Sequence, residues 1–402
     1  MTLAFAEGGI TAPLGFMAAG VNAGVKKSGR RDVALLVADK TCPAAAVFTT
    51  NAMAAPPVLV SREHIAGGTI RACVVNSGNA NACTGERGVR DARAMAQAAA
   101  DALGCRPDEV IVASTGVIGV PLPVEPVCAG IWAASEELDS NTGDDAAEAI
   151  MTTDTFIKTT AVSLDVDGVT VTVGGMAKGS GMIQPDMATM LAFVTTDAPL
   201  SAEACDKALR LATARTFNRI TVDSDTSTND MCVLMASGAA GGAEITSHDA
   251  RFVEIAAAIE HVCGELARMV VRDGEGATKL ITVTVEGAAT EDEAETAAFS
   301  IANSPLVKTA IFGRDANWGR VAMAIGKSGA HLDPAHVKIW FAGLLMCENG
   351  VGVPFSEDEA AVALGTDEVE IRVDLGAGTA SATVWTCDLS YDYVRINGEY
   401  RS

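Results

Sequence analysis

The sequence is short of basic residues, of paired cysteines and of long uninterrupted hydrophobic runs. Its 402 residues carry 29 Lys and Arg against 51 Asp and Glu, a formal net charge of −22 at pH 7. A negative surplus of this size opposes binding to nucleic acid and to anionic membranes. We therefore expect neither partner, and a small anionic substrate would need a local patch of positive charge.

Metal-binding and disulfide patterns are also missing. The ten cysteines form no CxxC pair and no dense framework, and the five histidines show no HExxH or other ligand spacing. Scattered cysteines of this kind indicate reduced thiols in a cytoplasmic protein, most of them small buried hydrophobic residues. Metal chemistry has little support.

The hydrophobic pattern predicts a soluble protein although the mean hydropathy is positive. The longest uncharged stretch, residues 41–61, contains Pro43, Pro56 and Pro57, which interrupt a membrane-spanning helix. The first residues carry Glu7 in their apolar part and no basic leader, so no signal peptide is predicted. The length suggests two or three domains or lobes.

Two familiar ligand motifs fail on their spacing. Residues 319–328 resemble a phosphate-binding loop, but their glycines are too far apart for GxxxxGK[ST], and a helix with its end fits better. Residues 223–230 suggest a calcium loop, but Thr228 occupies the glycine position and Leu234 the position of the bidentate Glu. We interpret this stretch as a polar turn that could flank a pocket. GxSxG is absent as well.

Strands and helices alternate along the chain without a strict βαβ period. The best helices are predicted at 84–103, 201–216 and 247–270, the last entered through Ser247, and residues 292–295 are predicted as an exposed loop or a helix start. A hairpin is predicted at 161–174, on both sides of Asp167-Gly168. Strand patterns occur at 33–38, 71–75, 110–113, 280–286, 368–374 and 379–387. These elements indicate a layered α/β or α+β fold rather than a doubly wound dinucleotide fold.

The segment KGSGMIQPDMATMLAF, which begins at residue 178, combines features that fit self-cleavage before Thr189. A threonine hydroxyl needs a base, and cleavage would place a free α-amine with a pKa of about 7.7 to 8.0 beside it. Ala188 leaves the preceding carbonyl uncrowded, and Thr189 has few side-chain rotamers. Lys178 adds a cation nearby. The same residues are also ordinary punctuation of a loop that enters an apolar strand.

An acyl transfer needs donors for the developing oxyanion. Ser114, Thr115 and Gly116 follow the predicted strand 110–113 and would form an N–H-rich turn at its end. On its own this turn is a weak indication.

The longer pattern resembles the ornithine acetyltransferase (glutamate N-acetyltransferase, ArgJ-type) family of arginine biosynthesis. The resemblance rests on GGMAKGSGMIQPDMATML at 174–191 and on segments in the expected order along nearly the whole chain. These are AAGVNAGVKKSGRRDVAL (18–35), VVNSGNANACTG (74–85), ASTGVIGVPLP (113–123), IMTTDTFIK (150–158), VRDGEGATKL (271–280), IFGRDANWGR (311–320) and YVRINGEYRS (393–402).

The resemblance implies a precursor that cuts itself between Ala188 and Thr189. The products would be an α chain, residues 1–188, and a β chain, residues 189–402, associated as an α2β2 heterotetramer. The implied fold is that of the DmpA-type aminopeptidases, with layered sheets between helices. No cofactor or metal is implied.

Site residues follow from the resemblance position by position. Thr189 is expected as the nucleophile, and Thr115 and Gly116 as the oxyanion hole. Substrate contacts are expected from Thr152, Lys178, Thr189, Glu275, Asn397 and Ser402. The choice of Thr152 over the adjacent Thr153 rests on spacing alone.

The implied reaction is a two-step exchange. Thr189 accepts the acetyl group of N2-acetylornithine, and glutamate then takes it to give N-acetylglutamate. Whether acetyl-CoA also serves as donor is left open. Two alternatives stand beside it: an amidohydrolase or aminopeptidase of the same fold that uses water as acceptor, and a non-catalytic metabolite-binding or scaffold protein.

Overall fold

The computed structural model describes residues 2–184 and 190–399, which form two compact units. The larger unit holds the chain up to Asn218 together with Thr226–Val270. The smaller unit holds Arg219–Asp225 and, among the described residues, 271–399. Both units pack helices against a sheet, which confirms the predicted layered α/β fold.

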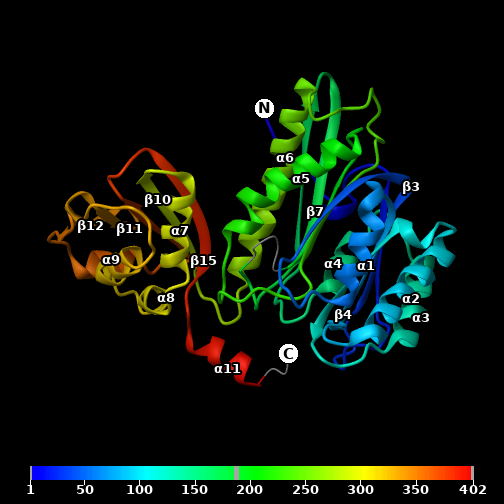
Figure 1. Ribbon diagram of the computed structural model, residues 1–402, viewed down its shortest axis with the longest axis horizontal. Helices are drawn as coiled ribbons and strands as arrows, with labels where there is room; N and C mark the ends of the chain where they lie inside the picture. The colour runs from blue at the N-terminus through cyan, green and yellow to red at the C-terminus, as the bar shows by residue number, and fades with distance from the viewer. Residues whose placement is uncertain (1, 185–189, 400–402) are drawn as a thin grey trace. The chain divides into compact units, whose positions relative to one another are not determined.

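The larger unit is built on one sheet, to which its described residues contribute nine strands (Figure 1). Their order is β1 (Ala4–Phe5), β6 (Lys158–Val166), β7 (Val169–Lys178), β8 (Leu191–Thr196), β9 (Met231–Ala236), β3 (Val33–Phe48), β4 (Thr69–Asn79) and β5 (Val110–Val117), with β2 (Phe16–Val21) paired to β3. The helices are α1 (Pro56–His64), α2 (Gly85–Leu103), α3 (Val124–Glu136), α4 (Gly143–Ile150), α5 (Ala202–Arg215) and most of α6 (Ala250–Arg272).

Strand β3 is covered on both faces. Its first residues alternate between two cores: Val33, Leu35 and Val37 pack with side chains of α2 and α3. Ala34, Leu36 and Ala38 point the other way, into a core shared with α4. Burial on both sides explains why the run 33–38 is apolar without alternation, because a strand points successive side chains to opposite faces.

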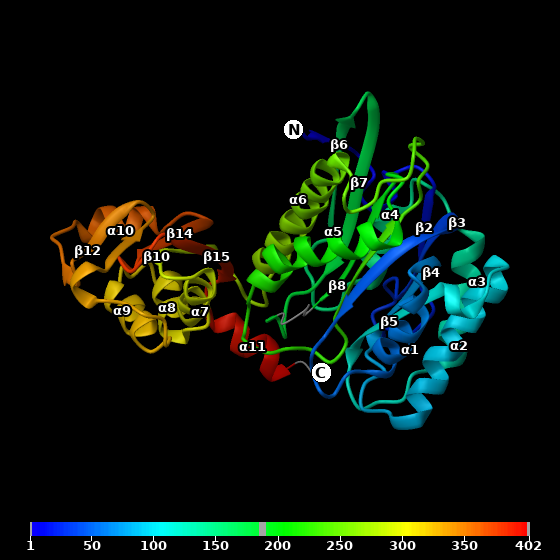
Figure 2. The same cartoon turned by 45° about the horizontal axis from the view of Figure 1, so that its top comes forward.

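The predicted hairpin is formed by β6 and β7, which run side by side as a long ribbon (Figure 2). Asp167 and Gly168 at its turn have φ of +53° and +82°, the left-handed conformations that a tight two-residue turn requires. Strand β7 ends at Lys178 and lies antiparallel to β8, so that Lys178 pairs with Leu191. Strand β8 in turn runs parallel to β9, and Leu191 pairs with Met231.

The three predicted helices are present as α2, α5 and α6. Ser201 caps α5 as predicted, because its hydroxyl accepts a hydrogen bond of 3.2 Å from the Ala204 N–H. The predicted entry of α6 at Ser247 is wrong by three residues, since the helix begins at Ala250. The Ser247 hydroxyl instead donates to the carboxylate of Glu203, at 2.5 Å.

The smaller unit has a sheet of six strands among its described residues, in the order β13 (Val351–Gly352), β12 (Leu344–Glu348), β11 (Lys338–Phe341), β14 (Glu368–Asp374), β10 (Leu280–Ala288) and β15 (Ala380–Cys387). Its helices are α7 (Glu291–Ala302), α8 (Pro305–Phe312), α9 (Trp318–Gly326), α10 (Glu357–Ala363) and α11 (Tyr391–Glu399). Residues 292–295 are the first turn of α7, capped by Thr290. The stretch rejected as a phosphate loop is α9 and its end, as predicted.

Candidate active site

Strand pairing in the larger unit gathers segments that are far apart in the sequence. The end of β7 lies opposite the start of β8, and the start of β8 lies beside the start of β9. The Met231 N–H donates to the Met190 carbonyl, at 3.0 Å. Lys178, the chain just after Thr189, and Asp230 therefore belong to one region of the sheet.

Lys178 reaches the predicted oxyanion residue Thr115. Its Nζ donates to Thr115 Oγ1 at 3.2 Å, and the lysine side chain is buried. An ammonium group has only donors, so the Thr115 hydroxyl must accept from it and can direct its own proton elsewhere. Two residues predicted separately from the sequence are thus in contact.

The prediction of a turn at residues 114–116 is wrong in one respect, because β5 continues to Val117 and pairs with β4 up to Asn79. The pairing register shifts at Gly78 and Asn79, where the strands approach closely. Gly116 has φ of +129°, and a Cβ there would lie 2.4 Å from the carbonyl carbon of Gly78. Only glycine fits this position, so the N–H of Gly116 is held by an irregular strand end.

Asp154, which the sequence did not single out, connects several predicted residues. Its Oδ1 accepts from Lys158 Nζ and from the Gly179 N–H, both at 2.7 Å, and its Oδ2 accepts from the Thr152 N–H at 2.9 Å. The carboxylate therefore ties the Thr152 loop to the residue that follows Lys178. The neighbouring Thr153 shares a 2.5 Å hydrogen bond with Ser180 through their hydroxyls.

The pKa values of two buried carboxyl groups near Lys178 are shifted in opposite directions. Burial alone would raise the pKa of Asp154, but the ammonium groups of Lys178 and Lys158 outweigh it and hold that pKa below its usual range. Burial raises the pKa of Asp230 well above its usual value, and Lys178 opposes this only in part. One carboxyl is thus kept ionised and the other tends to hold its proton, a pairing typical of acid–base sites.

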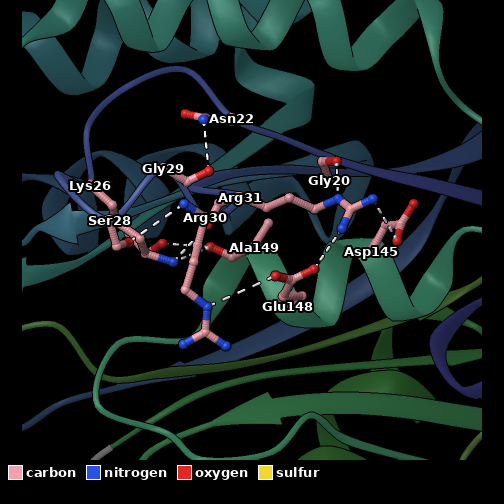
Figure 3. Close-up of polar contacts among 11 residues, drawn as sticks. Gly20, Asn22, Lys26, Ser28, Gly29, Arg30, Arg31, Asp145, Glu148 and Ala149 are labelled. Atoms are coloured by element: carbon pink, nitrogen blue, oxygen red, sulfur yellow. Dashed lines mark hydrogen bonds and ion pairs between the residues drawn. The ribbon is translucent and has the colours of Figure 1, made fainter.

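A cationic loop, residues 22–31, makes polar contacts with α4 (Figure 3). Lys26 Nζ donates to the carbonyls of Arg31 and Ala149, at 2.7 and 3.4 Å. The Arg31 guanidinium binds Glu148 at 2.6 Å, and the Asp32 carboxylate accepts the Lys26 N–H at 2.8 Å. These contacts fold the loop back onto α4.

Lys26 lies close to the pairing of β4 with β5. A Cβ on Gly78, the β4 residue that pairs with Gly116, would lie 3.1 Å from the Lys26 side chain. Burial lowers the pKa of Lys26 to about 8, against a raising effect of the Asp32 carboxylate. A lysine in this range changes charge close to neutral pH.

The smaller unit brings together two further predicted residues. Asn397 Nδ2, on α11, donates to Glu275 Oε2 at 2.8 Å and to the Tyr393 carbonyl at 3.1 Å. Glu275 is buried and is followed by Gly276, whose φ is +71°. A Cβ on Gly276 would lie 2.4 Å from the backbone nitrogen of Tyr393, so this glycine sets how closely α11 packs.

The polar turn at 223–230 does flank a pocket, as predicted. Asp223 and Ser224 line a pocket of about 140 Å³ in the smaller unit, together with Lys308 and Tyr393. The Tyr393 hydroxyl donates to Asp223 Oδ2 at 3.4 Å. Burial, with the Asp223 carboxylate next in effect, raises the pKa of Tyr393.

Three predicted site residues, Ala188, Thr189 and Ser402, lie outside the described residues. Within 2–184 and 190–399, no group of three or more His, Cys, Asp or Glu side chains could hold a metal ion. In the same ranges, no helix is both long and apolar enough to cross a membrane.

The sequence reading missed Asp154, Asp230 and Lys26. Each stands inside a segment that carried the resemblance or in the rejected calcium loop, so its neighbourhood was noticed without its role. A signal existed for Lys26, because KKSGRR concentrates positive charge in a strongly acidic chain. The two aspartates carry no such signal, since burial and charge partners arise only on folding.

Fold and site together define an enzyme. A buried lysine on a threonine hydroxyl, a sterically forced glycine and two carboxyls with opposite pKa shifts gather at adjoining strand ends, as active-site groups do. The model of the ArgJ family matches residues 17–402. The chain therefore belongs to the ArgJ family, which confirms the resemblance seen in the sequence.

Relatives align along almost their whole length. The chain is 55% identical over 397 residues to the arginine biosynthesis bifunctional protein ArgJ of Symbiobacterium thermophilum, covering 98% of this chain and 99% of that protein. It is 50% identical over 400 residues to the protein of the same name from Caldanaerobacter subterraneus, covering 98% and 99%. A crystal structure of ArgJ from Bacillus halodurans matches with 47% identity and a TM-score of 0.51, covering 52% of this chain and 98% of that chain.

Replacing Asp154 with Asn should destabilise the protein strongly. Lys158 is fully buried, and removing the carboxylate charge that faces it should cost roughly 3–5 kcal/mol. Because the Asp154 pKa is depressed on folding, this contribution is complete above the usual carboxyl pKa of about 4 and shrinks as the pH falls below it. Thermal unfolding followed by circular dichroism at pH 7 and pH 3 measures the difference.

The control for Asp154→Asn is Asp165→Asn. Asp165 lies exposed in the β6–β7 hairpin and accepts the Gly168 N–H, at 3.0 Å. We expect its substitution to change stability by about 0.5 kcal/mol or less. Equal losses for the two variants would contradict a special role for the Asp154–Lys158 pair.

Lys26 should give stability a dependence on pH in the alkaline range. Its pKa is about 8 in the folded protein against 10.5 for an ordinary lysine, so between these values the unfolded chain binds more protons. Stability from this group therefore rises with pH. The midpoint of thermal unfolding of the wild type, relative to Lys26→Met, should increase from pH 7.5 to about 10, over the interval between the two values.

The exposed neighbour Lys27 supplies the matched control. Lys27→Met should keep the pH dependence of the wild type. If Lys26→Met and Lys27→Met follow the same curve, the assignment of this titration to Lys26 is wrong.

Proposed function

We propose that the chain is an acetyltransferase of arginine biosynthesis that moves the acetyl group of N2-acetylornithine to glutamate through an ester on Thr189. The observation that carries the proposal is the contact of Lys178 with Thr115, beside Gly116 and opposite the start of β8. This contact brings a cation and the proposed oxyanion donors close to β8, the strand that follows Thr189 in the sequence. The sequence resemblance supplies the nucleophile.

Self-cleavage comes first in the proposed sequence. The Thr189 hydroxyl attacks the carbonyl of Ala188, the acyl group moves from nitrogen to oxygen, and water hydrolyses the ester. Residues 1–188 and 189–402 become the α and β chains, and Thr189 gains a free α-amine. That amine serves as the base for its own hydroxyl in the transfer reaction.

The sheet order explains how the two chains would stay together. Strands β8 and β9 belong to residues 189–402, yet they lie between β7 and β3 of residues 1–188 and are hydrogen-bonded to both. Cutting the chain before β8 therefore leaves its sheet contacts in place. The boundary between the compact units lies elsewhere, so the division at 188/189 is one of chains rather than of folded units.

The comparisons offer a second support for a divided chain. Relatives such as that of Symbiobacterium thermophilum match over 99% of their length, whereas the crystallised Bacillus halodurans chain is 98% covered by only 52% of this one. That crystallised chain is thus about half as long as the matched relatives. One fragment of a divided precursor would have this length.

The transfer is a balanced two-step exchange. The Thr189 Oγ–H attacks the acetyl carbonyl, its α-amine takes the proton, and the C–N bond breaks as ornithine leaves with that proton. The neutral α-amine of glutamate then attacks the ester, its proton passes through the Thr189 α-amine to Oγ as the C–O bond breaks, and N-acetylglutamate leaves the restored threonine hydroxyl. The Thr115 hydroxyl and the Gly116 N–H serve each tetrahedral oxyanion as donors.

Side chains of opposite charge would hold the substrates. Lys178 suits a substrate carboxylate, which the net charge of −22 would otherwise repel, and Glu275 suits an ammonium group. Of the two adjacent threonines, Thr153 is engaged with Ser180, so Thr152 is the better candidate for a substrate contact. Asn397 orients Glu275, and Ser402 would add a hydroxyl and the terminal carboxylate.

We extend the proposal to a cytoplasmic α2β2 assembly that uses no cofactor. The ten cysteines all lie among the described residues and are free thiols, as expected in a reducing compartment. The relatives are called bifunctional, which favours acetyl-CoA as a second acetyl donor to glutamate. A comparison of acetylornithine and acetyl-CoA, each with glutamate, tests this extension.

The purified protein should migrate as two fragments that end at 188 and begin at 189. Thr189→Ala removes the attacking hydroxyl and should give a single chain of 402 residues, whereas Thr189→Ser keeps a hydroxyl and should still be cut. Intact mass spectrometry and N-terminal sequencing measure both outcomes. A wild type that stays whole while active would overturn the self-cleavage step.

Ornithine release should depend on the acceptor. With N2-acetylornithine alone the enzyme should release ornithine only to the extent of one acetyl group per site, and added glutamate should sustain turnover. Release at the full rate without glutamate would instead identify a hydrolase of the same fold.

Gly276→Ala should raise the KM for acetylornithine by about 10-fold or more, because the new methyl group forces α11 and Asn397 away from Glu275. Gly326→Ala is the matched control, since nothing lies within 4 Å of a Cβ at this position of the same unit. Steady-state kinetics at saturating glutamate distinguish the two. An unchanged KM in Gly276→Ala would contradict a substrate role for the Glu275–Asn397 pair.

A further inference from the structure

Asn229 is a buried residue that has no role in the proposed mechanism. It lies in the loop before β9 and is only 5% exposed. Two residues later, Met231 binds the carbonyl of Met190 and begins the pairing of β9 with β8. Asn229 is therefore attached to the strand pair that begins just after Thr189.

The side chain of Asn229 binds residues at the ends of strands β4 and β5. Its Nδ2 donates to the carbonyls of Ala80 and Ser114, at 2.6 and 2.8 Å. Carbonyl oxygens can only accept, so the nitrogen of the carboxamide must face them. Its Oδ1 accepts from the Thr228 hydroxyl at 2.7 Å, so every polar atom of the side chain is satisfied and its orientation is fixed.

The Ser114 carbonyl belongs to the same planar peptide as the Thr115 N–H. A hydrogen bond to that oxygen fixes the plane of the peptide. Because the peptide is planar, it also fixes the direction of the Thr115 N–H and the position of the Thr115 Cα. The Ser114 hydroxyl is held from the β4 side, because it donates to Asn76 Oδ1 at 2.6 Å. Asn76 Nδ2 in turn donates to the Asn79 carbonyl at 2.9 Å, next to the crowded Gly78–Gly116 contact.

We propose that Asn229 is a positioning residue that locks the oxyanion donors, Thr115 and Gly116, to the strand pair beside the nucleophile. This inference rests on the proposed function. Asn229 joins β5, through the Ser114 carbonyl, to the start of β9, and β9 pairs with β8, the strand that follows Thr189 in the sequence. A displacement of about 1 Å in such an arrangement can cost about 10²-fold in rate.

The test uses Asn229→Asp and Asn229→Ala in the full-length, self-cleaved protein. Asp keeps the shape but turns the donors into acceptors that face two carbonyls, and Ala removes both hydrogen bonds. We expect kcat per cleaved site to fall about 10²-fold in both variants, with KM for acetylornithine within about 3-fold of the wild type. Formation and breakdown of the acetyl-enzyme should slow by similar factors, because both steps pass through an oxyanion.

A less disruptive variant tests the same inference if Asn229→Asp and Asn229→Ala fold poorly. Thr228→Val removes only the donor that holds Asn229 Oδ1 and should lower kcat about 10-fold at unchanged KM. The control is Thr213→Val, which removes another buried hydroxyl, one that donates to the Leu209 and Arg210 carbonyls within α5. It should lower the midpoint of thermal unfolding comparably while leaving kcat unchanged.

The outcomes separate the inference from the proposed function. If the wild type transfers acetyl groups but all three site variants keep kcat within about 3-fold, Asn229 has no positioning role and the inference is wrong. A fall of kcat in Thr213→Val as large as that in Thr228→Val, at a comparable loss of stability, would also overturn it. A wild type that produces no N-acetylglutamate would refute the proposed function itself, whatever the variants do.

Discussion

The insertion of β8 and β9 between β7 and β3 is the constraint on which the rest of the structure depends. Because both inner strands are hydrogen-bonded on each side, the chain on either side of Thr189 is held in one continuous sheet. The same pairing fixes Lys178 opposite the start of β8 and brings β9 beside it. In the proposed self-cleavage, the sheet rather than the covalent chain would hold the two parts together.

The local charge at the candidate site is positive, although the protein as a whole is strongly negative. The chain carries a net charge of −22, yet Lys26, Lys158 and Lys178 converge near one end of the sheet. Asp154 stays ionised between two of these lysines, and Asp230, buried nearby, favours its neutral form. A local positive environment of this kind suits carboxylate-bearing substrates and the negative charge that develops in acyl transfer.

The sequence predicted the regular elements well where the pattern is local. Strands such as β10 and β14, the hairpin at Asp167-Gly168 and the helix capped by Ser201 follow from alternation, turn chemistry and capping within a few residues. The prediction at 114–116 was less accurate, because the backbone there is shaped by Gly78 on a neighbouring strand. A contact between two distant strands cannot be predicted from the local sequence of either strand alone.

Some residues of the candidate site were likewise predicted from the sequence and others were not. The resemblance identified Lys178, Thr115, Glu275 and Asn397, and the structure places each of the two pairs in contact. Asp154 and Asn229 could not be predicted, because their importance lies in partners 25 and 115 residues away in the chain. Their side chains are common in turns, and only the packed structure shows that each one joins separate loops.

The central claim is that Thr189 carries the acetyl group between the two substrates. The most direct test is to incubate the self-cleaved protein with N2-acetylornithine in the absence of glutamate, quench it in acid and map the mass of each fragment. The account predicts an increment of one acetyl group on the fragment that begins at residue 189, located on its first residue and discharged when glutamate is added. An acetyl group on another residue, or none at all while transfer proceeds, would contradict it.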